Sequence, residues 1–511
     1  MISTFLLAVV LDFPPGIHRL SAPICLGTND SHPVLRGAAD GSTVISGGCE
    51  LPPFEVGEKG VWHVRVPDGI VPEQLWVGGR RAQRAVSPNG IGNYYHIRQN
   101  AFEEDDGTGR IDDLSGRAFH VEEKEVFPLL AGLSERELHE VFVHAYFAWD
   151  TEWLRIRRAV PDRDLIVLTA KTKRDFFRWK KWQLRFKIEN CRAALDAPGE
   201  WWFDSKAREI LYLPRPGETT DTVRAEVPTL ERWVSIEGTP EKPVTDIVFS
   251  NLTFACAGHR MPEMLFVGQS TFNVGGTIEA RNARRIHFRN CRFRATSRNA
   301  IWFCDGTRES SVVGCTFADL GAGGVRIGQP YLSKPRPRET LAGLVTVEDN
   351  VFAQGGRLFP EGTAVDIDNA VDCRVVHNEI LDFFYTGIHC DQSGATSEPR
   401  TYIAFNRIHD LGRGVMCDMG GIYLTGPERG SVVEGNVVSG VWSYSYTGAG
   451  GTGLYSDEKC TGAVFASNLV YRTKTSPVNQ HYGWDNVFVN NILALTTPER
   501  PLLVRTRQEQ G

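Results

Sequence analysis

The second half of the chain repeats one short pattern of hydrophobic and polar positions. Two or three β-forming residues precede a small or polar residue, often Asn, and two or three more β-formers follow, as in Ile286–Phe293, Val345–Phe352 and Val464–Val470. Between Leu252 and Asn491, consecutive copies are 23 to 39 residues apart. Such periods are typical of solenoids and propellers, but a propeller blade of four strands needs about 40 residues. Because most of these units are shorter, the pattern predicts a parallel β-helix.

Asparagine recurs at one place in the repeat: Asn350, Asn378, Asn406, Asn436, Asn468 and Asn491. Asn tolerates the left-handed backbone conformation of tight turns. Identical amides on stacked rungs, about 4.8 Å apart, can hydrogen-bond along the coil. We therefore expect an asparagine ladder at a turn of the β-helix.

A second strand follows in most repeats and aligns without gaps: Ala300–Cys304, Gly324–Gly328, Ala364–Asp368, Gly387–Asp391, Gly421–Thr425 and Gly453–Asp457. Side chains of a strand alternate between its two faces. One parity is mostly apolar and is predicted to fill the coil. The other parity holds Trp302, Arg326, Asp366, His389, Tyr423 and Tyr455, then Asp368, Asp391, Thr425 and Asp457, and the next rung adds Asn479 and His481. These residues are predicted to form one outward wall.

The chain before residue 236 is organised differently. Gly16–Leu20, Pro33–Arg36 and Thr43–Ser46 already look like coil strands, whereas residues 55–235 break the repeat with strand-like runs such as Val61–Val66. We predict an all-β protein, a right-handed parallel β-helix with an inserted β-sandwich-like domain. Residues 1–54 form the first rungs, 55–235 the insert, and 236–511 the β-helix that carries the groove. A domain on the flank of the coil could wall that groove.

Composition and charge narrow the class of partner. The formal net charge is -6 and the pI is near 6.1, so neither nucleic acid nor an anionic membrane is expected as the main partner. The chain has no apolar run of about 18 residues, and Phe5–Leu11 lacks the flanking features of a signal peptide. The eleven cysteines include no CxxC pair, which favours buried free thiols over disulfides or zinc. No metal and no cofactor are predicted.

The outward wall combines aromatic rings, carboxylates and imidazoles. Aromatic faces stack on the C–H faces of sugar rings, and carboxylates accept charge-assisted hydrogen bonds from hydroxyls. The wall therefore favours a carbohydrate as the partner. The alternative is that these Asp and His side chains only hold turns together.

Several stretches in a fixed order carry a resemblance: Ile188–Asn190 with Ala194–Trp201, Asp319–Gly328, Asp418–Tyr423, Gly453–Glu458 and Gln480–Tyr482. In these the sequence resembles the pectin-lyase-like parallel β-helix proteins of the glycoside hydrolase family 141 type, related to family 120. The resemblance implies hydrolysis of glycosidic bonds in plant-type oligo- or polysaccharides, with fucosidase and xylanase activities known in family 141. It also implies a secreted or periplasmic location.

Glycosidases generally place two carboxyl groups across the scissile bond. The resemblance maps this pair to Asp418 and Asp457, which meet only if the turn before Tyr423 folds back. The strand alignment also allows Asp391 with Asp368 on adjoining rungs, or Asp391 with Asp457 two rungs apart. Asp457 ranks first among these candidates.

The remaining candidates are predicted to bind substrate: Trp302, Arg326, Asp366, His389, Tyr423, Tyr455, Glu458, His481 and Trp442. His481 and His389 could each orient a carboxylate or bind a hydroxyl. Trp442–Tyr446 could form an aromatic lid or a packed loop. Two other functions remain open: a polysaccharide lyase, disfavoured because Arg326 is the only outward Arg of the aligned strands, and a non-catalytic glycan-binding solenoid.

Overall fold

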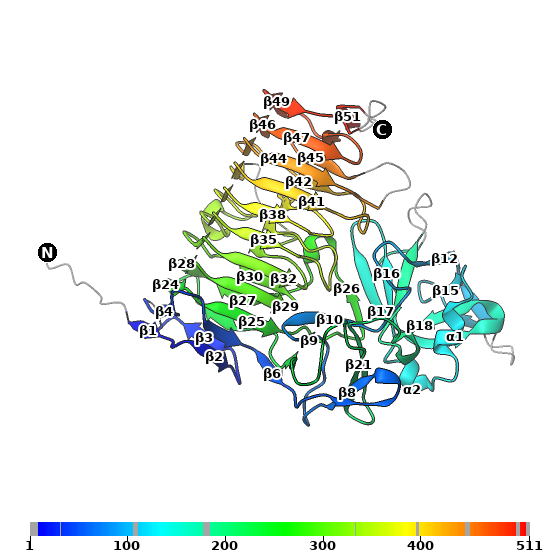
Figure 1. The fold of residues 1–511 in the computed structure, drawn as a ribbon. Helices are drawn as coiled ribbons and strands as arrows, with labels where there is room; N and C mark the ends of the chain where they lie inside the picture. Colours follow the sequence, from blue (N-terminus) through cyan, green and yellow to red (C-terminus); the bar gives the residue numbers. More distant parts are fainter. Residues whose placement is uncertain are drawn as a thin grey trace.

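A computed structural model describes residues 9–30, 32–105, 111–176, 184–332, 334–394, 398–444, 450–496 and 501–506. Within these residues, three parallel sheets of eleven strands each form the faces of a β-helix (Figure 1). Each rung gives one strand to each sheet, as β40 (Tyr402–Ala404), β41 (Arg407–Leu411) and β42 (Gly420–Thr425) do. The predicted parallel β-helix is confirmed.

The three sheets have regular order along the axis of the coil. The first sheet contains β1 (Val10–Asp12), β4 (Val34–Arg36), β24 (Val244–Ser250), β28 (Ala283–Arg289), β31 (Ser311–Val313), β34 (Thr346–Glu348), β37 (Arg374–Val376), β40, β43 (Val432–Glu434), β46 (Val464–Ala466) and β49 (Val487–Val489). The second contains β2 (Gly16–Arg19), β5 (Thr43–Ser46), β25 (Thr253–Ala257), β29 (Arg292–Thr296), β32 (Thr316–Leu320), β35 (Val351–Ala353), β38 (Glu379–Leu381), β41, β44 (Val437–Val441), β47 (Leu469–Thr473) and β50 (Ile492–Leu493). The third contains β3 (Ile24–Gly27), β23 (Val234–Glu237), β27 (Gly276–Arg281), β30 (Asn299–Phe303), β33 (Val325–Gly328), β36 (Val365–Asp368), β39 (Ile388–Asp391), β42, β45 (Thr452–Ser456), β48 (Val478–His481) and β51 (Leu503–Thr506).

The interior of the coil is apolar and stacked in register. The inward residues of the aligned strands, such as Ile301, Ile367 and Leu454, are fully buried. Phenylalanines also stack from rung to rung, with ring centroids 4.7 Å apart for Phe293 and Phe317. Burial of each such side chain stabilises the fold by about 1.5–3 kcal/mol, so the coil has one continuous core along its length.

The predicted asparagine ladder is present. The Nδ2 of Asn378 donates to the Oδ1 of Asn406 at 3.0 Å, Asn406 to Asn436 at 2.9 Å, and the same bond joins the other neighbours from Asn350 to Asn491. The left-handed residue, however, is the one before each Asn, with φ of 54° to 65°. The Asn is therefore needed for its amide, which bridges rungs, and not for a left-handed backbone.

The insert interrupts the second rung between β5 and β23, and it contains two units nested in each other. The outer unit is a sheet of β6 (Gly48–Glu50), β22 (Ala225–Pro228), β9 (Leu75–Val77), β10 (Arg80–Arg84), β20 (Glu200–Asp204), β21 (Glu209–Tyr212), β8 (Trp62–Arg65) and β7 (Glu55–Val56). The inner unit contains β11 (Val86–Ser87), β19 (Arg185–Glu189), β12 (Tyr95–Asn100), β15 (Ala118–Val121), β18 (Leu165–Leu168), β17 (Thr151–Val160) and β16 (Phe142–Tyr146). The predicted inserted β domain is thus confirmed, and β16 pairs with β19 to close the inner unit into a barrel.

Little of the described chain is helical. It contains α1 (Val126–Leu130) and α2 (Glu135–Leu138), and the single-turn helices η1 (Glu58–Gly60), η2 (Pro161–Arg163), η3 (Arg192–Ala194), η4 (Gln269–Thr271) and η5 (Arg338–Thr340). A hairpin of β13 (Glu103–Asp105) and β14 (Ile111–Asp113) extends from the inner unit. No helix of the described residues has the length and hydrophobicity to cross a membrane. All eleven cysteines are free and nine of them are buried, as predicted.

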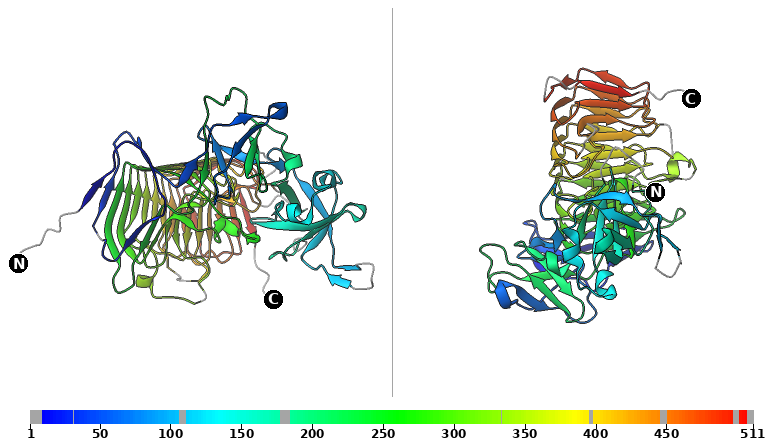
Figure 2. Two further views of the ribbon diagram at one scale, coloured as in Figure 1. Left: turned by 90° about the horizontal axis from the view of Figure 1, so that it is seen from below. Right: turned by 90° about the vertical axis from the view of Figure 1, so that its right-hand side faces the viewer.

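The insert lies against one flank of the β-helix (Figures 1 and 2). Arg81 of β10 donates from Nε to the Oδ1 of Asp319 at 2.6 Å, and the indole of Trp76 donates to its Oδ2 at 2.7 Å. The strand β26 (Met264–Phe266), which follows β25, pairs with β17 of the inner unit. These contacts fix the insert at the end of the second sheet, where the chain crosses to the third.

Candidate active site

The third sheet brings the predicted outward side chains into one column. In the observed register Trp302 pairs with Arg326, and the column continues through Asp366, His389, Tyr423, Tyr455 and Asn479, with Asp368 beside Asp391 in the neighbouring column. The wall is covered, however, because these side chains from Arg326 to Tyr455 are only 1–3% exposed. Other elements close over the sheet and leave a cavity where an open groove was expected.

Asp457 directly follows β45 and is held by two side chains. Its Oδ1 lies 2.7 Å from the Nδ1 of His481, and its Oδ2 accepts a hydrogen bond from the hydroxyl of Tyr423. Burial acts to lower the pKa of His481, but the hydrogen bond and negative charge of Asp457 outweigh it and raise that pKa. The imidazole is therefore favoured as a cation beside the carboxylate.

Asp418 precedes β42 and lies on a turn, where its φ of 47° is left-handed. This turn folds the carboxyl group toward Tyr455, whose hydroxyl donates to Oδ1 at 2.9 Å, while the hydroxyl of Tyr385 donates to the backbone carbonyl at 3.1 Å. Burial and the negative charge of Asp457 raise the pKa of Asp418 to about 7. The carboxyl group can therefore keep its proton near neutral pH.

The two tyrosines join the two carboxyl groups. Tyr423 and Tyr455 are register partners on adjacent rungs, and their rings stack with centroids 4.5 Å apart. Tyr423 bonds to Asp457 and Tyr455 bonds to Asp418. The structure thus brings together the pair that the resemblance implied, and the turn before Tyr423 folds back as that pairing requires.

A cavity of about 740 Å³ lies in front of this pair. Of the candidates from the sequence, those lining it are Asp391, Asp418, Asp457, Tyr423, Tyr455, Glu458 and His481. A cavity of this size can enclose a sugar unit with several polar groups around it. The arrangement places a carboxyl group whose pKa is raised to about 7, a second carboxyl group held by two hydrogen bonds and an imidazole with a raised pKa in a confined space.

Other side chains of the cavity were not among the sequence candidates. Trp149 and Arg174 come from the insert, Gln269 begins the single-turn helix η4, and Tyr331 lies in the loop after β33. Arg174 is fixed by Asp150, with Nη2 2.7 Å from Oδ2. No sequence pattern marked these residues, since each lies outside the repeat and reaches the cavity through the docking of the insert or a loop.

Arg326, Asp366, Asp368 and His389 form a separate buried cluster next to the cavity and do not line it. The Nη2 of Arg326 lies 2.7 Å from Asp368 and its Nε 3.5 Å from Asp366, and His389 Nδ1 lies 2.8 Å from Asp366. Burial and the charge of Asp366 raise the pKa of Asp368 to about 7, against the opposing effect of Arg326. Asp368, a predicted catalytic residue, is thus held in an ion pair with Arg326 and does not reach the cavity.

Three residues of this cluster form the only group of His, Cys, Asp or Glu among the described residues whose ligand atoms are close enough together to hold a metal ion. Ligand atoms of Asp366, Asp368 and His389 lie within 4.8 Å of one another. The guanidinium of Arg326 already supplies a positive charge to both carboxylates. We therefore assign no metal to these residues.

Two predicted aromatic contacts lie away from the cavity. Trp302 donates from its indole to the carbonyl of Gly328 at 2.8 Å and stacks under Arg326. Trp442 is 42% exposed and does not line the cavity. Residues 445 and 446 of the predicted lid lie outside the described residues, and Tyr444 packs its ring on Arg185.

No family model and no curated protein matches the sequence. Solved structures with the same fold do match. One, named "Glycoside hydrolase", gives a TM-score of 0.78 at 20% identity and covers 95% of this chain and 89% of its own. Another, named "The complex structure of XylC with xylose", gives a TM-score of 0.53 at 11% identity and covers 96% of this chain and 71% of its own. At these identities the likeness shows a shared fold, and membership of family 141 or 120 stays a prediction.

Proposed function

We propose that this protein is a glycoside hydrolase that cleaves an oligo- or polysaccharide with Asp418 and Asp457 as its paired carboxyl groups. The observation that carries this proposal is their convergence from adjacent rungs on one cavity, with the pKa of Asp418 raised to about 7. Glycosidases need one protonated carboxyl group and one carboxylate at the scissile bond. The names of the two structural neighbours agree with this class of reaction.

The environments of the two groups assign their roles. Asp418 keeps its proton near neutral pH and acts as the general acid, protonating the leaving oxygen. Asp457 accepts hydrogen bonds from Tyr423 and His481, which stabilise a carboxylate, so it acts as nucleophile or as base toward water. The rings of Trp149 and Tyr331 offer faces for the sugar.

The test compares Asp457→Asn and Asp418→Asn with the wild-type chain on aryl glycosides, beginning with xylosides and fucosides. Each substitution keeps the shape of the side chain and should lower kcat by at least about 100-fold, the contribution typical of acid–base catalysis. Asp410→Asn is the matched control, since Asp410 is exposed and, within the described part of the chain, forms an ion pair with His409 alone. Unchanged release of reducing sugar by Asp457→Asn would remove Asp457 from the mechanism.

A polysaccharide lyase on the same coil is the second candidate. Arg326 is buried under the carbonyls of Thr271 and Phe272, but Arg174 and Lys459 both line the cavity and could neutralise a uronate. A lyase would release unsaturated products that absorb ultraviolet light, whereas a hydrolase would not. Sugar binding by the wild-type chain without either product would favour the non-catalytic solenoid.

A further inference from the structure

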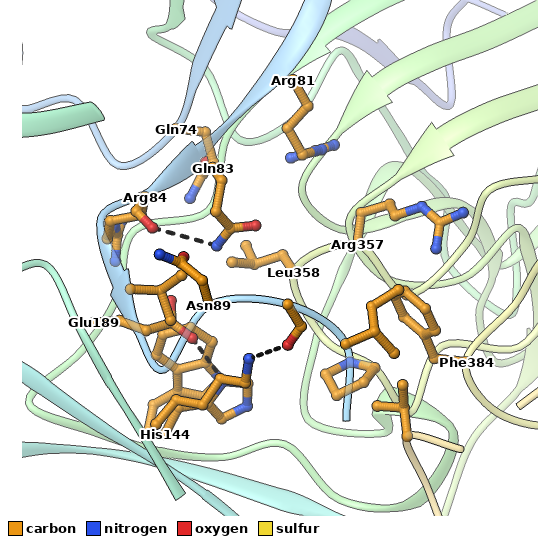
Figure 3. A pocket seen from close by; sticks show the side chains of 18 of the residues that line it. Gln74, Arg81, Gln83, Arg84, Asn89, His144, Glu189, Arg357, Leu358 and Phe384 are labelled. Atoms are coloured by element: carbon orange, nitrogen blue, oxygen red, sulfur yellow. Dashed lines mark hydrogen bonds and ion pairs between the residues drawn. The ribbon is translucent and has the colours of Figure 1, made fainter. Parts of the chain in front are cut away.

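A second cavity, of about 250 Å³, lies where the insert meets the β-helix (Figure 3). It is lined by β10, by β16, β17 and β19 of the inner unit, and by β-helix loops around Arg357 and Phe384. None of its lining residues belongs to the candidate active site. It is thus a separate space built jointly by all three parts of the fold.

Aromatic rings form much of its wall: Tyr94, Tyr146, Trp153, Trp201 and Phe384. The imidazole of His144 stacks on the indole of Trp153, with centroids 3.9 Å apart. Rings that line a cavity give it an apolar wall, against which the C–H groups of a ligand can pack.

Lys187 brings a buried ammonium group to the cavity, although the side chain is only 8% exposed. Its Nζ donates to the carbonyls of Pro88 at 3.0 Å and Gly90 at 2.8 Å. An ammonium group has three donors, and no carboxylate of the described chain forms an ion pair with it. Burial lowers the pKa of Lys187, and the charge of nearby Glu189 acts against this. The two carbonyls use two of the three N–H groups, and the ammonium also lies 5.3 Å from the centre of the Tyr94 ring, so the third N–H can face this ring or a ligand.

Glu189 and His144 form a buried pair beside it. The Nδ1 of His144 lies 3.0 Å from the Oε1 of Glu189, the contact drawn in Figure 3. The Nε2 of His144 has no hydrogen-bond partner among the described residues. Burial lowers the pKa of His144, and the hydrogen bond and charge of Glu189 act against this. Leaving such a group unpaired costs about 1–3 kcal/mol.

The mouth of the cavity is polar and open. Gln83 and Asn89 line the cavity (Figure 3) and Gln83 is exposed; Ile91, another lining residue, is 55% exposed. Gln83 uses its amide nitrogen in a long bond of 3.3 Å to the carbonyl of Arg84. Its amide oxygen is available to a molecule that enters.

The charges of the remaining lining residues are compensated. Arg81 pairs with Asp319 at 2.6 Å, Arg84 with Glu73 at 2.8 Å, and Arg357 with Asp382. Lys187 and Glu189 add one charge of each sign. The cavity therefore has no excess charge that would select an anion or a cation.

We propose that this cavity is a second sugar-binding site, which takes one neutral pyranose ring, either free or at the end of a glycan chain. Its volume equals that of about eight water molecules at about 30 Å³ each, enough for a single ring. The Lys187 ammonium, the Glu189 carboxylate and the amides of the mouth bind hydroxyls, and the aromatic wall packs on the ring. The site does not depend on the proposed hydrolase activity.

Crystals of the full chain soaked with D-xylose, L-fucose, D-galactose or D-glucose, together with calorimetric titration, test the proposal. We expect density for one ring in this cavity, and Lys187→Met should weaken that binding by about tenfold or more, the loss of one charged hydrogen bond. Gln83→Trp blocks the mouth without touching the buried groups and should abolish it. Gln99→Trp, at an exposed position of β12, is the matched control and should bind normally.

The sources of the ring are separated by a disaccharide soak. If one ring of the disaccharide binds and the other projects out of the cavity beside Ile91, the site takes the ends of glycan chains. If only monosaccharides enter, it takes free sugar. Sugar density in the candidate active site alone would overturn the proposal, and so would binding that Gln83→Trp leaves intact. Occupation by glucuronate but by no neutral sugar would also overturn it.

Discussion

The hydrogen bond from Tyr455 to Asp418 is expected to set the pH at which the proposed general acid loses its proton. Burial and Asp457 raise the pKa of Asp418 from 3.8 to about 7, which corresponds to about 4 kcal/mol of preference for the protonated form. The Tyr455 hydroxyl acts in the opposite direction, because it donates at 2.9 Å to the carboxylate and stabilises its ionised form.

Tyr455→Phe removes this donor and keeps the ring that stacks on Tyr423. A hydrogen bond to a charged group is worth about 1.5–3 kcal/mol, or about one to two pH units. The pKa of Asp418 should rise by that amount, so the carboxyl group stays protonated to a higher pH. The basic limb of the profile of kcat/KM against pH should move from near pH 7 to about pH 8–9.

The assay is the pH dependence of aryl glycoside hydrolysis by the wild-type chain and the variant. Tyr402→Phe is the control, because Tyr402 on the first sheet donates to Glu434 at 3.1 Å in the same chemical arrangement. Its profile should match that of the wild type. A basic limb that stays in place in folded Tyr455→Phe would refute the assignment of Asp418 as the acid.

Three further substitutions test the buried polar groups. Burial raises the pKa of Glu361 from 4.5 to about 8, so the stability that the protonated carboxyl group contributes is complete below pH 4.5 and is lost as the pH rises through 8. At pH 9, urea titration should give Glu361→Gln a free energy of unfolding that exceeds that of the wild type by up to about 5 kcal/mol, whereas at pH 5 the two should be similar. Arg326→Met leaves Asp366 and Asp368 without their cation and should destabilise the fold by about 3–5 kcal/mol, and added calcium should raise the melting temperature of this variant alone. Asn406→Ala removes four ladder hydrogen bonds and should lower the free energy of unfolding by about 3 kcal/mol or more, with a smaller loss contradicting the role of the ladder.

The sequence predicted the columns of the third sheet because side-chain alternation in a strand is strictly twofold. Tyr423, Tyr455 and Asp457 were found in this way, and Tyr423 and Tyr455 have the register partners that were expected. Asp418 lies off the strand, so parity could not place it, and the resemblance alone pointed to it. Its left-handed φ is a turn property that no hydrophobic pattern encodes.

What covers the wall could not be predicted. Parity gives Arg326 as outward, but the chain around Phe272 closes over it and leaves it 1% exposed. Trp149 and Arg174 reach the cavity because β26 pairs with β17, a contact between residues more than 100 positions apart. Such contacts depend on how whole units dock, and the local sequence does not record this.

The nested position of the insert has a consequence for synthesis of the chain on the ribosome. The strand β4 pairs with β24 and β3 pairs with β23, yet the whole insert is translated between the members of each pair. The strand edges of the amino-terminal rungs therefore stay unpaired until the insert has been synthesised, and pairing between strands so far apart in the sequence is slow. From β24 onward each new turn can be added to a finished template, so the vulnerable period for aggregation falls early in translation.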